Sequence, residues 1–140
     1  MLVVLDTNVV VSAILWKGRL APLFELLNRR VLTPCFNPET VAELFRVADY
    51  PHIFKQSRRM GTDLKSVFAR VVEAGIVVED VKISETVPDD PSDEKFLACA
   101  VVARANFIIS GDSHLLRLGM FRDIPILSPR MFLAIFKKEI

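Results

Sequence analysis

Short apolar runs alternate along the chain with segments in which apolar residues recur every three or four positions. The runs are rich in valine, isoleucine and leucine, and they predict buried strands at residues 2–5, 31–35, 76–81, 107–109 and 124–127. The intervening segments predict helices at residues 7–15, 21–30, 38–50, 64–74, 93–103, 112–118 and 129–136, with a short helical piece after Pro51. Such alternation is typical of an α/β fold, so we expect a three-layer α/β/α sandwich with a mainly parallel central sheet.

Polar residues and prolines set the expected ends of several helices. Asn37–Pro38 and Ser128–Pro129 each combine a capping side chain with a proline suited to the first helical position. Ser92 follows a polar segment and is expected to cap the helix whose first turn contains Asp93. Pro51 is expected to end the helix that starts at Asn37–Pro38, because proline cannot continue the hydrogen-bond ladder of a helix.

The bulk composition fits a chain with one buried sheet. At 140 residues it has the size of one ordinary domain, and no repeat or linker divides it, so we expect a single domain over residues 1–140. The chain is 51% hydrophobic with a mean hydropathy of +0.36, as expected when strands are covered on both faces. The formal net charge of +1 does not exclude a nucleic-acid partner, because a near-neutral total can conceal an acidic cleft and basic surfaces.

The cysteines and the N-terminus bear on the compartment. Cys35 and Cys99 lie in apolar segments without the spacing of a zinc site, so we expect small buried hydrophobes in a reducing cytoplasm. No apolar run reaches the ~18 residues of a membrane helix. The first apolar run is interrupted by Asp6 and Asn8, with no cleavage pattern after it. We therefore expect a cytoplasmic protein with no signal peptide and no membrane partner.

Four acidic residues are the most informative feature of the chain. Asp6 and Asp112 follow predicted strands, Asp93 opens a predicted helix, and Glu43 lies within another helix, off its main apolar stripe. Loops at the carboxyl ends of parallel strands line a common crevice, so these carboxylates can converge. Their mutual repulsion is usually relieved by a hard cation, and Mg²⁺ or Mn²⁺ suits a set of oxygen ligands. Because two such ions can align a water and stabilise a leaving oxygen, hydrolysis of nucleic-acid phosphodiester bonds follows as a hypothesis.

Each acid taken alone also has a purely structural explanation. Asp6 and Asp112 could cap helices, Asp93 could complement a helix dipole, and Glu43 could be a solvated helix residue. The joint pattern favours a site, because three of the four adjoin predicted strand ends on the same side of the sheet.

The order and spacing of these segments resemble the PIN domain family, and within it the toxin-type ribonucleases of bacterial and archaeal toxin–antitoxin pairs. The resemblance rests on residues 5–9, Glu43–Leu44, Asp93 with the helix at 96–98, and residues 110–116. It implies a PIN-like fold and Mg²⁺- or Mn²⁺-dependent endoribonuclease activity, with single-stranded or structured RNA as the substrate. It also implies an antitoxin protein as partner, and a homodimer.

By this resemblance Asp6, Glu43, Asp93 and Asp112 would be the catalytic, metal-binding acids. We expect Asp6 and Asp93 to be direct ligands, and Asp112 to bind through water or to serve a second ion. Members of the family vary at the fourth acid, which is Asp112 in this chain. Glu43 could bind metal or orient the attacking water.

Further residues are candidates for supporting these acids. Asn8 and Ser110 are expected to hold the acids in place by hydrogen bonds, as metal ligands commonly require. Asp89 and Asp90 precede the crevice and could assist, or could belong to a solvated loop. Lys95 could reach a substrate phosphate or pair with an acid.

Other polar and aromatic residues have two interpretations each. His52 and His114 lack a partner at metal-ligand spacing and are expected to be surface or hydrogen-bonded residues. The basic run at 55–59 could contact phosphates or form a solvated helix face. Trp16, beside Lys17, could stack on a base or pack under its loop.

Three alternative functions can be weighed against the nuclease. A receiver-type signalling domain needs an acidic pair after its first strand and a lysine after its fifth, which this chain lacks. A phosphatase of the haloacid dehalogenase kind needs an aspartate where Asn8 stands. The stronger rival is a non-catalytic PIN-fold module that binds RNA or protein, although such a module has no need of four clustered acids.

Overall fold

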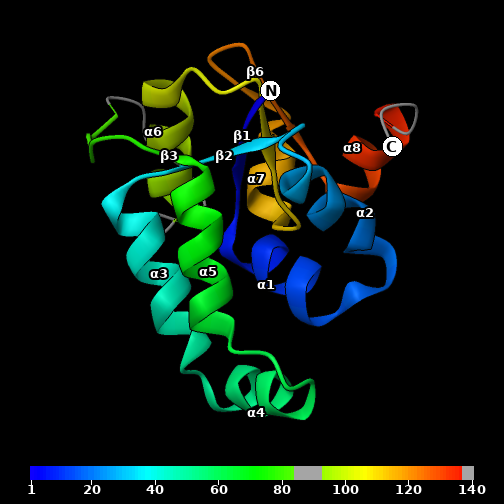
Figure 1. The fold of residues 1–140 in the computed structure, drawn as a ribbon. Coiled ribbons are helices and arrows are strands. Elements are labelled where there is room, and N and C mark those ends of the chain that lie inside the picture. Colours follow the sequence, from blue (N-terminus) through cyan, green and yellow to red (C-terminus); the bar gives the residue numbers. More distant parts are fainter. Residues whose placement is uncertain (84–92, 137–140) are drawn as a thin grey trace.

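The computed structural model describes residues 1–83 and 93–136, and these build a twisted sheet between helices (Figure 1). The strand order in the sheet is β3-β2-β1-β4-β6-β5. The strands are β1 (Leu2–Leu5), β2 (Thr33–Phe36), β3 (Ile76–Val77), β4 (Phe107–Ile109), β5 (Met120–Phe121) and β6 (Ile124–Leu127). All pairs are parallel except β5 with β6 at one edge. The expected mainly parallel sheet is confirmed.

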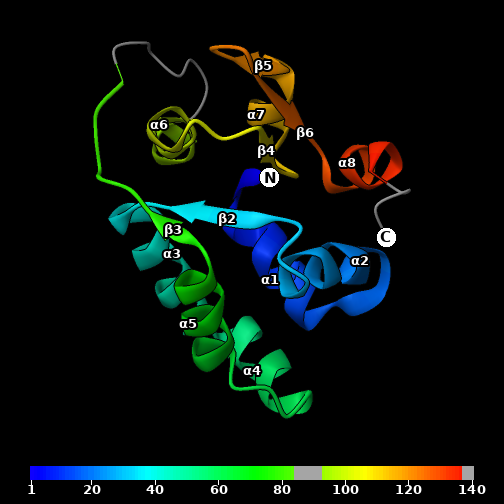
Figure 2. The same cartoon turned by 45° about the horizontal axis from the view of Figure 1, so that its top comes forward.

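Helices cover both faces of this sheet, which gives the three-layer α/β/α architecture (Figure 2). One layer contains α6 (Glu94–Ala103) and α7 (Ser113–Leu118). The opposite layer contains α1 (Thr7–Leu15), α2 (Lys17–Asn28), α3 (Pro38–Ala48), α5 (Leu64–Ala74) and α8 (Pro129–Ile135). The remaining helix, α4 (Pro51–Arg59), lies beyond the ends of α3 and α5, away from the sheet (Figure 1).

The central strand β1 shows how the apolar runs produce this arrangement. Val3 and Leu5 pack into the core on the side of α1, whereas Val4 packs into the core on the side of α6. Successive side chains of a strand point to opposite faces, so a continuous apolar run is stable only where both faces are covered. Residues 3–5 are accordingly buried, and the chain becomes polar at Asp6, where β1 ends.

Of the three predicted helix starts and the one predicted helix end, two starts are confirmed. Asn37 caps α3, and its Oδ1 accepts a hydrogen bond from the Thr40 N–H at 2.9 Å. Ser128 caps α8 in the same way. Pro51 does not end α3, which stops at Ala48, but is the first residue of α4, since a proline at this position loses no helical hydrogen bond. Asp93, rather than Ser92, occupies the N-cap position of α6. Ser92 and the rest of the loop at 84–92 lie outside the described residues.

Three strand and helix boundaries differ from the predictions for local reasons. The strand expected at 31–35 begins only at Thr33, because the N–H groups of Val31 and Leu32 bond back to the Leu26 carbonyl oxygen and close α2. The helix expected at 21–30 spans Lys17–Asn28, with Gly18 in a non-helical conformation at φ −23° and ψ −109°. The strand expected at 76–81 is limited to Ile76–Val77, because its partner β2 ends at Phe36.

The two cysteines behave as expected. Cys35 and Cys99 are free and buried, and burial raises the pKa of Cys35 to about 11 and that of Cys99 to about 12. Both thiols therefore stay protonated at neutral pH and act as small apolar side chains. Within residues 1–83 and 93–136, none of the helices is long and apolar enough to cross a membrane.

Candidate metal centre

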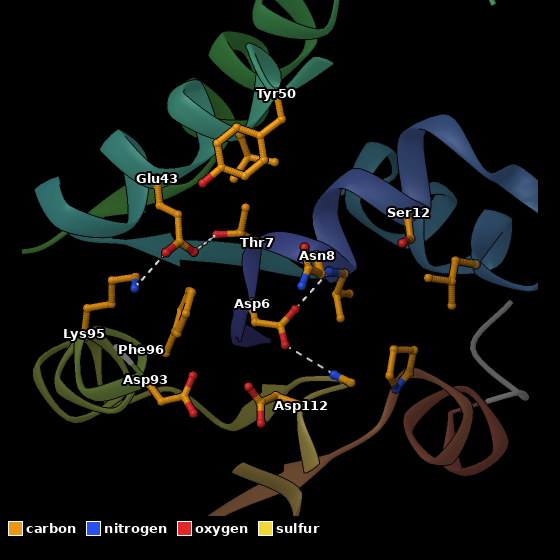
Figure 3. Close-up of a pocket in the computed structure, with 15 residues that line it drawn as sticks. Asp6, Thr7, Asn8, Ser12, Glu43, Tyr50, Asp93, Lys95, Phe96 and Asp112 are labelled. Carbon is orange, nitrogen blue, oxygen red and sulfur yellow. Dashed lines mark hydrogen bonds and ion pairs between the residues drawn. The ribbon is translucent and has the colours of Figure 1, made fainter. Parts of the chain in front are cut away.

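A cleft with a volume of about 500 Å³ opens where β1 and β4 end (Figure 3). All four predicted acids, Asp6, Glu43, Asp93 and Asp112, line it. They come from the end of β1, from α3, from the start of α6 and from the loop after β4, so the fold brings together residues from four distant parts of the sequence. Figure 3 shows the carboxylates of Asp93 and Asp112 facing each other and that of Asp6 nearby, bonded to backbone N–H groups, whereas that of Glu43 is turned toward Lys95.

Asp6 is held in a fixed orientation by several donors. Its Oδ1 accepts a hydrogen bond from the Val9 N–H at 2.9 Å, which makes it the N-cap of α1. Its Oδ2 accepts hydrogen bonds from the Gly111 N–H at 3.2 Å and from the Ser110 hydroxyl. Only 6% of Asp6 is exposed, and this burial raises its pKa above the ordinary 3.8, with the nearby Asp112 charge acting in the same direction. A cation beside Asp6 would offset this cost of burying a charge.

Ser110 links two of the acids. Its hydroxyl donates to Asp6 and accepts a hydrogen bond from the Asp112 N–H at 2.9 Å. This arrangement is the kind of support that was expected of Ser110. Asn8 lines the cleft and is exposed. Among the described residues, no hydrogen bond joins the Asn8 side chain to an acid, so its supporting role stays a prediction.

Asp93, Asp112 and His114 form the tightest group of potential metal ligands. One carboxylate oxygen from each aspartate and one ring nitrogen of His114 lie within 4.8 Å of one another. Asp93 is only 5% exposed, and within the described part of the chain its carboxylate does not cap α6. Asp112 caps α7 by accepting a hydrogen bond from the His114 N–H at 2.7 Å.

His114 was not predicted to belong to the site. Its Nδ1 lies 3.6 Å from Asp112 Oδ1. A signal for this contact is present in the sequence, because a residue two positions after an N-cap aspartate lies beside the capping carboxylate. The expectation of an ordinary surface or hydrogen-bonded histidine overlooked that signal.

Glu43 belongs to a separate cluster on the other side of the cleft. Its Oε2 pairs with Lys95 Nζ at 2.7 Å, and its Oε1 accepts a hydrogen bond from the Thr7 hydroxyl. Arg46 approaches the same carboxylate at 3.7 Å from the exposed side. Lys95 thus pairs with an acid, one of its two expected roles. Thr7 was not predicted at all, since nothing in its local sequence indicates a partner on α3.

The donor set fits a hard divalent cation. Carboxylate oxygens with at most one imidazole nitrogen suit Mg²⁺ or Mn²⁺, and the described residues of the cleft contribute no thiolate. Asp93 and Asp112 would hold such an ion, with His114 within range of both carboxylates and Asp6 contributing its charge from the same cleft.

The sequence model of one family, described as PIN domain, matches residues 2–114. This match covers all four acids and most of the chain. The chain belongs to the PIN domain family. PIN domains are generally divalent-metal-dependent nucleases, and the sheet, the flanking helices and the acidic cleft described above agree with this membership. Searches of curated proteins and of solved structures found no match to this PIN domain.

The other candidate residues are not among those that line the cleft, or lie outside the described residues. Lys55, Arg58 and Arg59 are exposed on α4, with Arg58 5.8 Å above the Phe54 ring. Trp16 is 46% exposed at the end of α1, so it does not pack fully under its loop. His52 is exposed at the start of α4, as expected for a surface histidine. Residues 89 and 90 lie outside the described residues.

Proposed function

We propose that this PIN domain is a Mg²⁺- or Mn²⁺-dependent endoribonuclease, a hydrolase of RNA phosphodiester bonds. The observation that carries the proposal is the convergence of Asp6, Asp93 and Asp112 in one cleft, with Glu43 on its opposite side. A structural explanation of each acid alone does not account for this convergence. Three buried or half-buried carboxylates in one cleft are costly without a cation, so their presence supports metal binding.

We assign distinct roles to these acids. Asp6, Asp93 and Asp112 would hold the metal ion, and Ser110 would keep Asp6 and Asp112 in register. When bound, the ion would supply positive charge for the scissile phosphate and lower the pKa of an attacking water. Glu43 stands apart from the other three and is oriented by two donors, Thr7 and Lys95. We assign it to orient the attacking water and to accept its proton.

The test is cleavage of a mixed RNA pool by purified protein with Mn²⁺, with Mg²⁺ and with EDTA. We expect fragments with either ion and none with EDTA. Asp6→Asn and Asp93→Asn are expected to lower the rate by at least about 100-fold, because each removes a charge from the ion's binding site. Asp49→Asn is the matched control, since it removes the same charge at an exposed ion pair with Lys65 outside the cleft.

Two results would count against this function. Cleavage that persists in EDTA, or in both cleft variants, would point to a contaminating ribonuclease. A folded wild-type protein that neither binds Mn²⁺ nor cleaves RNA would be the non-catalytic binding module instead.

We further propose that the protein acts on cytoplasmic RNA as the toxin of a toxin–antitoxin pair, with an antitoxin protein as partner, and that it forms a homodimer. Support for this comes from the sequence resemblance rather than from the cleft. Induced expression in a bacterial host should arrest growth, and Asp93→Asn should relieve the arrest. Normal growth with full wild-type expression would favour a role in RNA processing. Light scattering on the purified protein would test the dimer.

A further inference from the structure

We infer that Lys95 is a built-in cation that neutralises Glu43, so that the cleft takes one divalent ion, at Asp6, Asp93 and Asp112, and not two. This inference rests on the proposed metal-dependent function and specifies its metal content. In a two-ion site, a second metal ion would balance the charge of Glu43. Here we assign that role to Lys95.

The contacts of Lys95 are those of a fixed group rather than of a flexible surface side chain. Its Nζ lies 2.7 Å from Glu43 Oε2, and only 12% of the Lys95 side chain and 18% of the Glu43 side chain are exposed. The same Nζ lies 5.0 Å from the centroid of the buried Phe96 ring. The distance is typical of a charge-assisted hydrogen bond, which is stronger than a bond between neutral groups. An aromatic face adds further attraction for the ammonium group.

The backbone also holds Lys95 beside Glu43. Asn37 Nδ2 donates a hydrogen bond to the Lys95 carbonyl oxygen at 3.1 Å, while Asn37 Oδ1 caps α3, the helix that carries Glu43. One side chain thus fixes the distance between the start of α3 and the start of α6. The Lys95–Glu43 pair forms across this junction.

The position of Lys95 is unfavourable for α6 taken alone. It lies in the first turn, where the helix dipole favours negative side chains and disfavours an ammonium group. A residue that breaks a local preference is often retained for a function. Here the compensation is the pair with Glu43, whose carboxylate would otherwise add a fourth negative charge to the cleft.

A second ion would need Glu43 as a ligand. An ion at Oε2 would have to displace the Lys95 ammonium group from a mostly buried pair. The donors at Asp6 are neutral N–H and O–H groups, so they leave its negative charge for a cation. Removing Lys95 would leave the Glu43 charge with only the more distant, largely exposed Arg46, and a second cation could then take the place of the ammonium group. Lys95 therefore determines the number of ions.

The experiment is a titration of metal-free protein with Mn²⁺, in which free Mn²⁺ is measured by electron paramagnetic resonance. We expect the wild-type protein to bind one ion. Lys95→Met should bind two, because it keeps the length of the side chain but exposes the Glu43 charge to solvent cations. Combining Lys95→Met with Glu43→Gln should return the count to one, since the second ion depends on that carboxylate.

Lys65→Met is the matched control, because it removes the same charge from the exposed pair with Asp49 and should leave the count at one. Two ions in the wild-type protein would overturn the inference without any variant, as would one ion in a Lys95→Met protein with a native near-ultraviolet circular dichroism spectrum. RNA cleavage, measured in parallel, separates the two proposals. Two ions with cleavage would refute only this inference, whereas one ion without cleavage would refute only the ribonuclease.

Discussion

Thr7 connects two sides of the cleft through a single hydroxyl group. It is the first residue of α1 and is 5% exposed, and its hydroxyl donates to Glu43 on α3. Asp6, its neighbour in sequence, accepts hydrogen bonds from Ser110 and Gly111 in the loop that leads to Asp112. Asp6 and Thr7, adjacent residues that follow β1, thus lie on the two sides of the cleft, one in the loop network of Asp112 and the other bonded to Glu43.

Replacing Thr7 by valine tests whether its hydroxyl group orients the Glu43 carboxylate. Thr7→Val keeps the shape of the side chain and removes the donor, so Glu43 should lose orientation but not charge. A hydrogen bond to a charged group contributes about 1.5–3 kcal/mol, and we expect kcat to fall roughly 10- to 100-fold with KM nearly unchanged. Steady-state kinetics on a defined RNA would measure both constants.

Thr7→Ser retains the hydroxyl and is the control, with kcat expected close to that of the wild-type protein. If valine and serine lowered kcat equally, the methyl packing of Thr7 would matter rather than its hydrogen bond. If valine changed only KM, Glu43 would act in binding rather than in the chemical step.

At the residue scale, the positions of the four acids and the support from Ser110 were predictable, but the specific partners of Glu43 were not. Asp6 and Asp112 are found from strand ends, because the apolar runs before them set both the direction of the strands and the place where they stop. The Lys95–Glu43 pair and the Thr7–Glu43 bond depend on how α3 packs against α1 and α6, and neither helix alone encodes that geometry. The roles of the acids in binding and catalysis stay predictions.

Among the elements, the junction between α3 and α6 has the most direct bearing on function. Asn37 is 1% exposed, and its side chain bonds to the backbone of both helices. Its Oδ1 caps α3, and its Nδ2 donates to the Lys95 carbonyl oxygen in α6. A cap that also bonds to a second helix couples the stability of one element to the placement of the other.

Asn37→Ala should therefore have two effects. Loss of the cap and of the bond to Lys95 should lower the free energy of unfolding by about 1–2 kcal/mol. Because the two helices carry Glu43 and Lys95, the variant should also cleave RNA more slowly at temperatures where it is fully folded. Urea denaturation and cleavage assays would measure the two effects.

The control is Asp63→Ala, which removes the N-cap of α5 away from the cleft. It should destabilise the protein without slowing cleavage. Equal slowing in both variants would mean that activity follows general stability and not the α3–α6 junction.

The elements themselves were predicted well where sequence and packing agree. Leu2–Leu5 and Ile124–Leu127 match their predicted bounds, because each apolar run ends at a polar or helix-starting residue. β5 was not predicted, since Met120–Phe121 is too short for a periodic pattern and exists only by pairing with β6. The expectation of one domain over residues 1–140 stays a prediction.

For the whole molecule, the acidic cleft makes stability depend on metal and on pH. The pKa of Asp6 is raised on folding, so in metal-free protein its contribution to stability is full below 3.8 and is lost as pH rises through the higher folded value. A bound cation reverses this trend, because it competes with the proton for the same carboxylate.

Mn²⁺ should therefore raise the Tm of the wild-type protein at neutral pH, by the equivalent of about 2.7 kcal/mol at roughly 100 times its Kd. The increase should shrink as pH is lowered toward the acidic range, where protons occupy Asp6. Thermal melts with Mn²⁺ and with EDTA over a series of pH values would measure it. Asp93→Asn should abolish the increase, whereas Asp49→Asn, outside the cleft, should preserve it. A Tm that is the same with Mn²⁺ and with EDTA at every pH would contradict a metal centre in this cleft.

The central position of β1 has a consequence for the timing of activity during synthesis. β1 precedes the other strands of this sheet in the sequence, yet it lies between β2 and β4, and Asp6 at its end is held by Ser110 and Gly111, which follow β4. A nascent chain that ends before Ser110 contains Asp6 but lacks Ser110 and Gly111, which orient Asp6, and Asp112, which completes the set of acids. A ribosome-bound chain thus carries no assembled acidic centre until Asp112 has emerged. For the ribonuclease proposed above, this order of synthesis would spare the messenger and the ribosome that produce the protein.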